Sequence, residues 1–299
     1  MAENKKPARY KALAGLYYQM RNYPKAIDFA NRGLKLGQDP ELMVTLGQAY
    51  YQGGNNKEAV RVMNDVIAYF EKKGSTPKED TMLLVLTACQ KVNDNNCVTR
   101  LFEKLVVYYP KPEYWQNLLS ALVQSDLRDE QKINVMRLQV KVGVMKKPSE
   151  FTEMAQIAMD QGLPGEAQFI LEQAFTNKLF KDQREIDKNT RLLTAAKKQA
   201  EADKAGLAAK EAAAKAAATG DADVQLGAAY LGYGDNEKAL EALKRGVTKG
   251  KLTNADQAGI LLGIANLRTN NKAEAAKAFR TVKTDPTMTR IAKLWLLNT

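Results

Sequence analysis

A pattern of small and large apolar residues recurs along the chain at fixed spacing. A residue that is usually small is followed by a large one three positions on, and by small or apolar residues twelve, sixteen and nineteen positions on. One copy consists of Gly47, Tyr50, Ala59, Met63 and Val66. A pattern that returns in this way predicts stacked units, each too small to bury its apolar face alone. Six copies occur, and they begin at Ala14, Gly47, Leu86, Ala155, Gly227 and Gly263.

Two of the gaps between copies are about twice as long as the others. The first residues are separated by 33, 39, 69, 72 and 36 positions. A degenerate unit is therefore expected near Ala121 and another near Ala195, so the chain is predicted to hold about eight units. The apolar residues that support these two units lie twelve and nineteen positions on: Ile133, Val140, Leu207 and Ala214.

Apolar residues three and four positions apart predict helices within each unit. Ala59, Met63 and Val66 fall on one helical face. Side chains of Asp39 and Ser149 are expected to cap helix starts. Runs rich in Gly, Asn and Asp predict a turn between two antiparallel helices, and the fold class is therefore all-α. These turns are expected at 53–56, 93–96, 162–165 and 234–236.

The units resemble the tetratricopeptide repeat family residue by residue. The matches are to the small, aromatic, turn-glycine and alanine positions of its motif, and to the proline that ends a unit. The resemblance implies a right-handed α-solenoid of about eight helix-turn-helix repeats, two of them degenerate, with first helices that line a concave groove. It also implies ligand binding rather than catalysis. The matching residues are Gly47, Tyr50, Gly54 and Ala59, then Gly227, Tyr230, Gly234 and Ala239, and Pro110.

Three segments are expected along the chain. Residues 1–180 hold about five N-terminal repeats, and 221–299 hold the C-terminal repeats with a capping helix near the end. Between them, 181–220 is rich in Ala and Lys and predicts either one long helix packed inside the groove or a hairpin that bends near 202–206. This segment or a partner should cover an apolar strip of the C-terminal repeats. The strip consists of Val224, Ala228, Leu231, Ile260, Ile264 and Leu267.

The resemblance also gives candidate ligand residues on the first helices of the first three units. Tyr18 and Tyr51 occupy equivalent places, where they could either recognise a peptide or pack between neighbouring units. Gly15 and Leu84 stand where some members of the family carry an asparagine and an arginine that grip a terminal carboxylate, so that mode is not expected here. The candidates are Lys11, Tyr18, Gln19, Gln48, Tyr51, Gln52, Gln90 and Lys91.

Cys89 and Cys97 are the only cysteines, and the repeat places them on either side of a turn. Antiparallel helices can bring such a pair within the Cα separation of about 5.5 Å that a disulfide requires. The alternative is two buried thiols used as small apolar residues. A disulfide would imply an oxidising compartment, such as a bacterial periplasm or another extracytoplasmic space, and free thiols would suit the cytoplasm.

Charge and composition mainly argue against particular classes of function. The formal charge is +11, but it is spread evenly along the chain, which favours solvated helix faces over a nucleic-acid surface. The chain has no histidine, so the commonest general base and most zinc sites are missing, and we expect neither catalysis nor a cofactor nor a metal.

No run of about 18 apolar residues predicts a membrane span, and the polar start at 1–6 predicts no signal peptide. The sequence therefore predicts a non-enzymatic interaction scaffold, in a bacterial envelope, that binds a protein or peptide in its groove. The alternative is a cytosolic adaptor that contacts nucleic acid or another polyanion through its basic surface.

Overall fold

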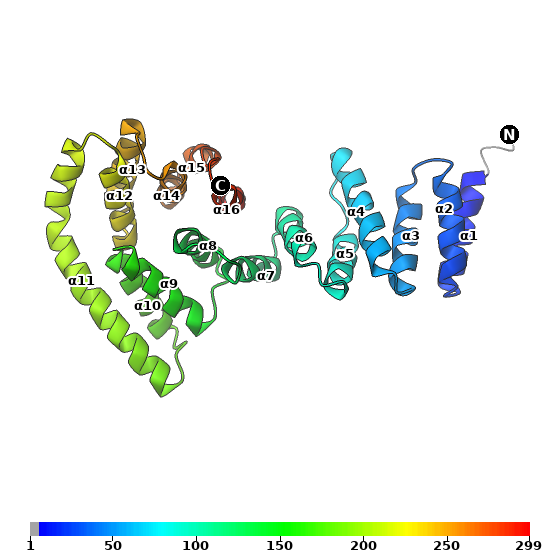
Figure 1. Ribbon diagram of the computed structural model, residues 1–299, viewed down its shortest axis with the longest axis horizontal. Coiled ribbons are helices and arrows are strands. Elements are labelled where there is room, and N and C mark those ends of the chain that lie inside the picture. Colours follow the sequence, from blue (N-terminus) through cyan, green and yellow to red (C-terminus); the bar gives the residue numbers. More distant parts are fainter. Residues whose placement is uncertain (1–5) are drawn as a thin grey trace. The chain divides into compact units, whose positions relative to one another are not determined.

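The computed structural model describes residues 6–299, and within them every regular element is a helix (Figure 1). The all-α prediction is confirmed. The chain divides into two compact units, residues 1–118 and 119–299. None of the helices between residues 6 and 299 combines the length and the apolar character that crossing a bilayer requires.

The first unit contains three helix pairs and the start of a seventh helix. The pairs are α1 (Lys6–Gln19) with α2 (Tyr23–Leu34), α3 (Pro40–Gln52) with α4 (Asn56–Lys72), and α5 (Glu79–Lys91) with α6 (Asn95–Tyr108); α7 (Pro112–Val123) crosses the boundary between the units.

The second unit continues with α8 and ends with α16. Its helices are α8 (Asp129–Lys141), α9 (Pro148–Asp160), α10 (Pro164–Thr176), α11 (Gln183–Ala216), α12 (Asp221–Tyr233), α13 (Asn236–Lys249), α14 (Ala255–Arg268), α15 (Lys272–Arg280) and α16 (Pro286–Leu296).

The repeated sequence pattern reflects one contact between the helices of a pair. At Gly47 an added Cβ would collide with the side chain of Met63, sixteen residues on. The same holds for Gly263 and Phe279. The first residue of the pattern must therefore be small because the bulky apolar residue of the second helix fills the space above it.

Helix starts agree only in part with the sequence. Asp39 caps α3, since its Oδ1 accepts hydrogen bonds from the backbone N–H groups of Glu41 (3.0 Å) and Leu42 (3.1 Å). Ser149 does not cap α9. The helix already begins at Pro148, a residue whose fixed φ suits a first turn, and Ser149 lies inside that turn.

Of the two degenerate units, one consists of two helices, as expected, and the other does not. α7 and α8 occupy the place expected near Ala121. The unit expected near Ala195 is instead one helix of 34 residues, α11. Its sequence consists largely of strong helix formers and has no run of Gly, Asn and Asp residues, so the helix continues through 202–206, where one alternative expected a hairpin to bend. Residues 6–299 thus hold six packed helix pairs, with α7, α8, α11 and α16 in addition.

α11 does not lie inside the groove, contrary to one of the sequence-based alternatives. It packs on α9, α10 and α12, on the far side of these helices from α8, α14 and α16 (Figure 1). Tyr233 of α12 donates a hydrogen bond from its hydroxyl to Asp203 Oδ2 (2.6 Å) of α11. Burial of Ala196 and Ala200 follows from this packing, because only small residues allow so close an approach.

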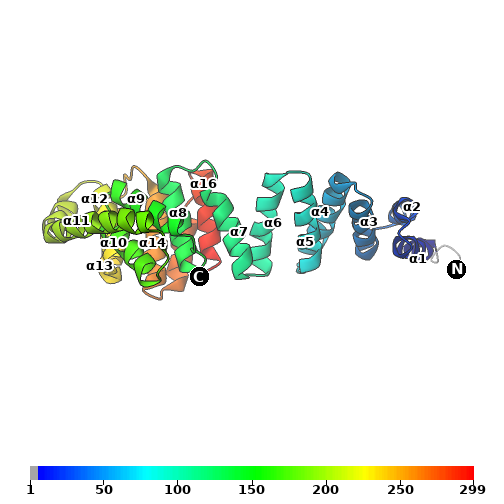
Figure 2. The same cartoon turned by 90° about the horizontal axis from the view of Figure 1, so that it is seen from below.

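The second unit closes on itself, because α16 returns to α8 (Figure 2). Asp285 Oδ2 accepts a hydrogen bond from Gln131 Nε2 (2.8 Å), and Trp295 donates its indole N–H to the carbonyl of Asn134 (3.3 Å). Trp295 also stacks on Phe279, with ring centroids 5.7 Å apart, so α16 caps the last helix pair.

This closure explains why the compact units differ from the segments expected at 1–180, 181–220 and 221–299. Residues about 150 positions apart meet across α8 and α16, and α12 stacks directly on α10 although α11 separates them in sequence. Such contacts join everything from 119 onward into one unit.

Candidate functional site

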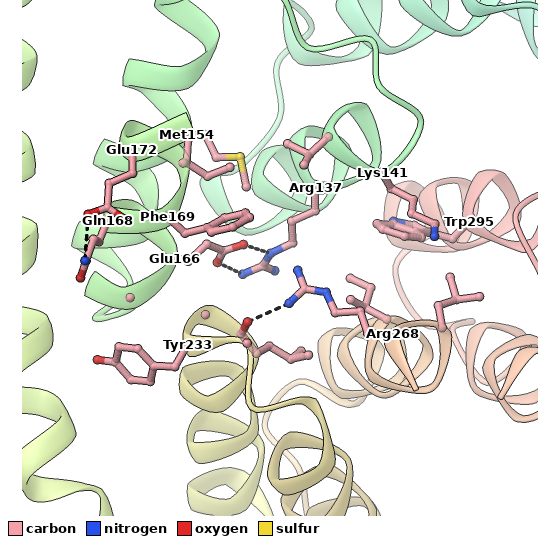
Figure 3. Close-up of a pocket in the computed structure, with 18 of the residues that line it drawn as sticks. Arg137, Lys141, Met154, Glu166, Gln168, Phe169, Glu172, Tyr233, Arg268 and Trp295 are labelled. Carbon is pink, nitrogen blue, oxygen red and sulfur yellow. Dashed lines mark hydrogen bonds and ion pairs between the residues drawn. The ribbon is translucent and has the colours of Figure 1, made fainter. Parts of the chain in front are cut away.

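A cavity of about 450 Å³ lies inside the second unit, among α8, α9, α10, α12, α14 and α16 (Figure 3). Eight apolar side chains from these helices contribute to its wall. Leu231, Ile264 and Leu267 belong to the strip that the sequence predicted to be covered. The strip is buried except for Val224, which is half-buried, and part of it faces this cavity rather than α11. The eight apolar side chains are Val140, Met154, Phe169, Ile170, Leu231, Ile264, Leu267 and Trp295.

A buried ion pair forms one side of the cavity (Figure 3). Arg137 of α8 donates from Nε to Glu166 Oε1 (2.7 Å) and from Nη2 to Glu166 Oε2 (2.6 Å). Its Nη1 donates to Asn134 Oδ1 (2.9 Å). Burial would raise the pKa of Glu166, but the charges of Arg137 and Arg268 hold it below its ordinary value, so the carboxylate is ionised at neutral pH.

Arg268, at the end of α14, lies beside this pair and has no carboxylate of its own. Its Nη1 donates to the carbonyl of Leu231 (2.7 Å), and within residues 6–299 it forms no ion pair. Burial lowers the pKa of Arg268, and Glu166 partly offsets this effect. Arginine nevertheless stays protonated at neutral pH. Arg137, Glu166 and Arg268 therefore leave one positive charge uncompensated in the cavity.

Two lysines lie at opposite edges of the cavity. Lys204 of α11 places its Nζ 4.9 Å from the ring centroid of Tyr233, and Lys141 lies near Trp295 (Figure 3). Burial and the hydrogen bond to Asp203 raise the pKa of Tyr233, so its hydroxyl remains protonated. Glu172 at the rim is paired with Lys197 (3.0 Å). The lining is thus apolar with an excess of positive charge.

The ligand residues expected from the sequence all belong to the first unit, and the residues that line this cavity do not include them. α1, α3 and α5 contact in order, which brings Lys91 Nζ to 4.1 Å from the ring centroid of Tyr51. The ring of Tyr18 packs against that of Tyr23, with centroids 6.0 Å apart. The contact of Tyr51 joins two neighbouring helix pairs and that of Tyr18 lies within one pair, and neither contact tests binding. Among the glutamines, Gln48 is half-buried, and the others are exposed: Gln19, Gln52 and Gln90.

Lys11 is less available than the sequence suggests. Its Nζ lies 3.1 Å from Asp39 Oδ2 and 2.5 Å from Glu41 Oε2, so α3 already supplies two carboxylates. These two contacts raise the pKa of Lys11 against the opposing effect of burial. The lysine therefore joins α1 to α3.

Sequence reasoning missed the charged residues of the cavity, although one signal was present. Arg137 stands sixteen residues after Ala121, where most other copies carry a bulky apolar residue such as Met63 or Phe279. A charged residue at a position that is apolar in the six copies is one reason why this unit looks degenerate. Its partner, Glu166, could not be identified because the pairing joins two different repeats.

The two cysteines form the expected pair. Cys89 of α5 and Cys97 of α6 are joined by a disulfide, with Cα atoms 5.9 Å apart. Asp94 caps α6 by accepting a hydrogen bond from the backbone N–H of Cys97 (2.9 Å). The turn therefore holds Cys97 opposite the end of α5.

Comparison with known proteins identifies the repeat. Residues 41–72, which form α3 and α4, match the family model described as tetratricopeptide repeat. No curated protein matches the chain. The chain therefore contains a tetratricopeptide repeat at 41–72, and proteins with such repeats mediate protein–protein interactions.

Several solved structures are similar to the chain at low identity. The TPR2AB domain of yeast Sti1, described in a complex with pHSP90, is 14% identical with a TM-score of 0.34, covering 99% of this chain and 100% of that one. A tetratricopeptide repeat protein from Parabacteroides merdae is 12% identical with a TM-score of 0.34, covering 98% and 99%. Yeast Tom70 is 11% identical with a TM-score of 0.35, covering 99% and 96%.

Proposed function

We propose that the protein is a non-enzymatic scaffold that binds a peptide segment of another protein in the cavity of its second unit. The observation that carries the proposal is the cavity itself, which is apolar, open to solvent and flanked by a few polar groups. Ligand sites in proteins have this composition, and their volumes run from about 300 to 1,000 Å³.

The size of the cavity favours a short segment over a folded partner. A volume of about 450 Å³ accommodates a few residues, not a domain. Phe169 remains 47% exposed although it points into the cavity, so a ligand could bury it further (Figure 3). Aromatic side chains that are buried on binding contribute strongly to affinity.

Peptide binding can be tested by selection from a random peptide display library on the immobilised chain. We expect enriched peptides to bind the unaltered chain and to bind Phe169→Ala about fivefold more weakly, because half of an aromatic side chain no longer contributes burial. Val107→Ala is the matched control, since Val107 is a similarly exposed apolar residue (52%) of the first unit. Peptides that bind Phe169→Ala and the unaltered chain equally would argue against this site.

We further propose that the protein works in an oxidising compartment, such as a bacterial envelope. The disulfide between Cys89 and Cys97 supports this assignment, because disulfides persist mainly outside the reducing cytosol. Alkylation of protein isolated from its native source, before and after reduction, provides the test. We expect Cys89 and Cys97 to be alkylated only after reduction. Alkylation of both thiols without reduction would favour a cytosolic adaptor.

A further inference from the structure

We propose that the cavity of the second unit recognises an acidic peptide, in which one carboxylate binds Arg268 and an adjacent apolar side chain packs on Phe169. This inference rests on the proposed peptide binding and specifies its chemistry. Arg268, Phe169 and the neighbouring Leu267 come from two different repeats that the folding of the unit brings together.

The charge balance of the cavity is the first argument. Arg137 and Arg268 carry two positive charges, and Glu166 supplies one negative charge between them. Arg268 is the exposed member of this group, so its charge is accessible to a ligand carboxylate. The positive edges at Lys141 and Lys204 also favour an anion over a cation.

The available hydrogen-bond donors single out Arg268. Arg137 uses Nε, Nη1 and Nη2 on Glu166 and Asn134. Arg268 uses only Nη1, on the carbonyl of Leu231, although a guanidinium has five N–H donors. Its side chain extends into the middle of the cavity, next to the ion pair (Figure 3). The planar fork of an arginine matches the two oxygens of a carboxylate.

The apolar wall decides what should accompany the carboxylate. Ile264 and Leu267 precede Arg268 by four residues and one residue on α14, and Phe169 faces them from α10. A ligand with a carboxylate but no apolar group would leave these surfaces exposed to water. An aromatic or aliphatic side chain next to the carboxylate would bury them. The preferred ligand is therefore acidic and apolar within the same few residues.

The experiment compares two peptides on the full chain. The first is the fluorescein-labelled heptapeptide Gly-Ser-Leu-Phe-Glu-Leu-Gly, blocked at its C-terminus, and the second has glutamine in place of glutamate. Fluorescence anisotropy should show about tenfold tighter binding of the glutamate peptide, the ratio typical of hydrogen bonds to a charged group. The ratio should shrink at 0.5 M salt without vanishing, because Arg268 is exposed to solvent and its charge is partly screened, whereas the hydrogen bonds of the fork remain.

Variants of Arg268 locate the interaction. Arg268→Gln keeps a donor for the Leu231 carbonyl and should abolish the preference for glutamate over glutamine. Arg268→Lys keeps the charge but loses the fork, so the preference should shrink without vanishing. Arg280→Gln is the matched control, since it removes one exposed arginine of the same unit, at the end of α15, and should leave the preference unchanged.

Three results would overturn the proposal. One is equal affinity for the two peptides, and another is a preference that survives in Arg268→Gln with the thermal unfolding of that variant unchanged. The third is decanoate binding as tightly as the glutamate peptide, with the same dependence on Arg268, since this would assign the cavity to fatty anions. Peptides from the display selection that bind through Phe169 without any acidic preference would leave the proposed function standing and refute only this inference.

Discussion

Arg137 is the residue that most clearly separates the second unit from a plain stack of repeats. It occupies a position of the repeat that is bulky and apolar in most other copies, and it is buried with Glu166 as its partner. An ion pair between α8 and α10 therefore gives the unit a polar centre. This ion pair lines the cavity, and Arg268 beside it adds the excess positive charge.

Glu166 should therefore matter for stability and for its dependence on pH. Glu166→Gln leaves Arg137 and Arg268 without a counter-charge, and we expect a loss of about 3–5 kcal/mol in the free energy of unfolding. The pKa of Glu166 is lower in the folded chain than its ordinary value of 4.5. Its stabilisation is thus present above pH 4.5 and is lost as pH falls through the folded pKa.

Denaturant unfolding at several pH values measures this effect. The difference between the unaltered chain and Glu166→Gln should be full at pH 7 and should shrink below pH 4.5. Glu274→Gln is the control, because the pair of Glu274 with Lys277 is exposed and should contribute less than about 1 kcal/mol. If the difference in unfolding free energy does not depend on pH, the Glu166 carboxylate is not the source of the stabilisation.

Gly263 tests the contact that underlies the repeat pattern. Gly263→Ala should destabilise the second unit by about 1–3 kcal/mol, since the new methyl group collides with the ring of Phe279, which is itself stacked on Trp295. Gly206→Ala is the control in the same unit. Nothing lies within 4 Å of the Cβ position there, so alanine should stabilise α11 by up to about 1 kcal/mol. Equal effects of the two changes, measured by denaturant unfolding, would contradict the packing argument.

At the scale of the element, α11 is the feature that the repeat pattern does not explain. It is inserted between two helix pairs that stack directly on each other, and it is fastened along their side by Tyr233 and Asp203. Glu211 adds a hydrogen bond from Tyr230 (3.1 Å). α11 differs from a degenerate repeat because it is one continuous helix.

Proline at Gly206 tests this continuity. The residue lies in the interior of a 34-residue helix, where proline removes a hydrogen bond and clashes with the preceding turn. Gly206→Pro should therefore cost about 3 kcal/mol in unfolding free energy and reduce the helical circular dichroism signal. An unchanged signal and stability would instead point to a bend at this position.

The helix pairs could be predicted from the sequence because each depends on contacts over a short and fixed separation, as between Gly47 and Met63. The position of α11 depends on partners about 30 residues away, and no periodicity encodes it. Only the apolar part of the candidate site could be predicted from the sequence, through Leu231 and its neighbours. Its charged part joins three repeats and becomes visible only when they are folded together.

At the scale of the second unit as a whole, closure of α16 onto α8 turns what would be an open groove into a cavity. Trp295 carries much of this closure, since it packs on Phe279, donates to Asn134 and lines the cavity. The binding properties proposed here therefore belong to the closed unit and not to the repeat as such.

Trp295→Ala should open this unit. We expect a loss of about 3–5 kcal/mol in unfolding free energy, the usual cost of removing a buried aromatic side chain. Affinity for the glutamate peptide should fall with it, because the cavity loses one wall. Leu297→Ala, which alters a neighbouring apolar residue that is 42% exposed, should change both quantities little. Unaltered peptide binding by a destabilised Trp295→Ala would place the peptide elsewhere.

Photo-crosslinking tests the central claim most directly, because it locates a bound peptide without assuming its site. The glutamate peptide, with benzoylphenylalanine in place of phenylalanine, is irradiated with the full chain, and mass spectrometry identifies the attached residues. The account predicts crosslinks in the wall of the cavity, at residues such as Met154, Phe169 and Leu267. Crosslinks confined to the first unit, around Tyr51 and Lys91, would contradict it.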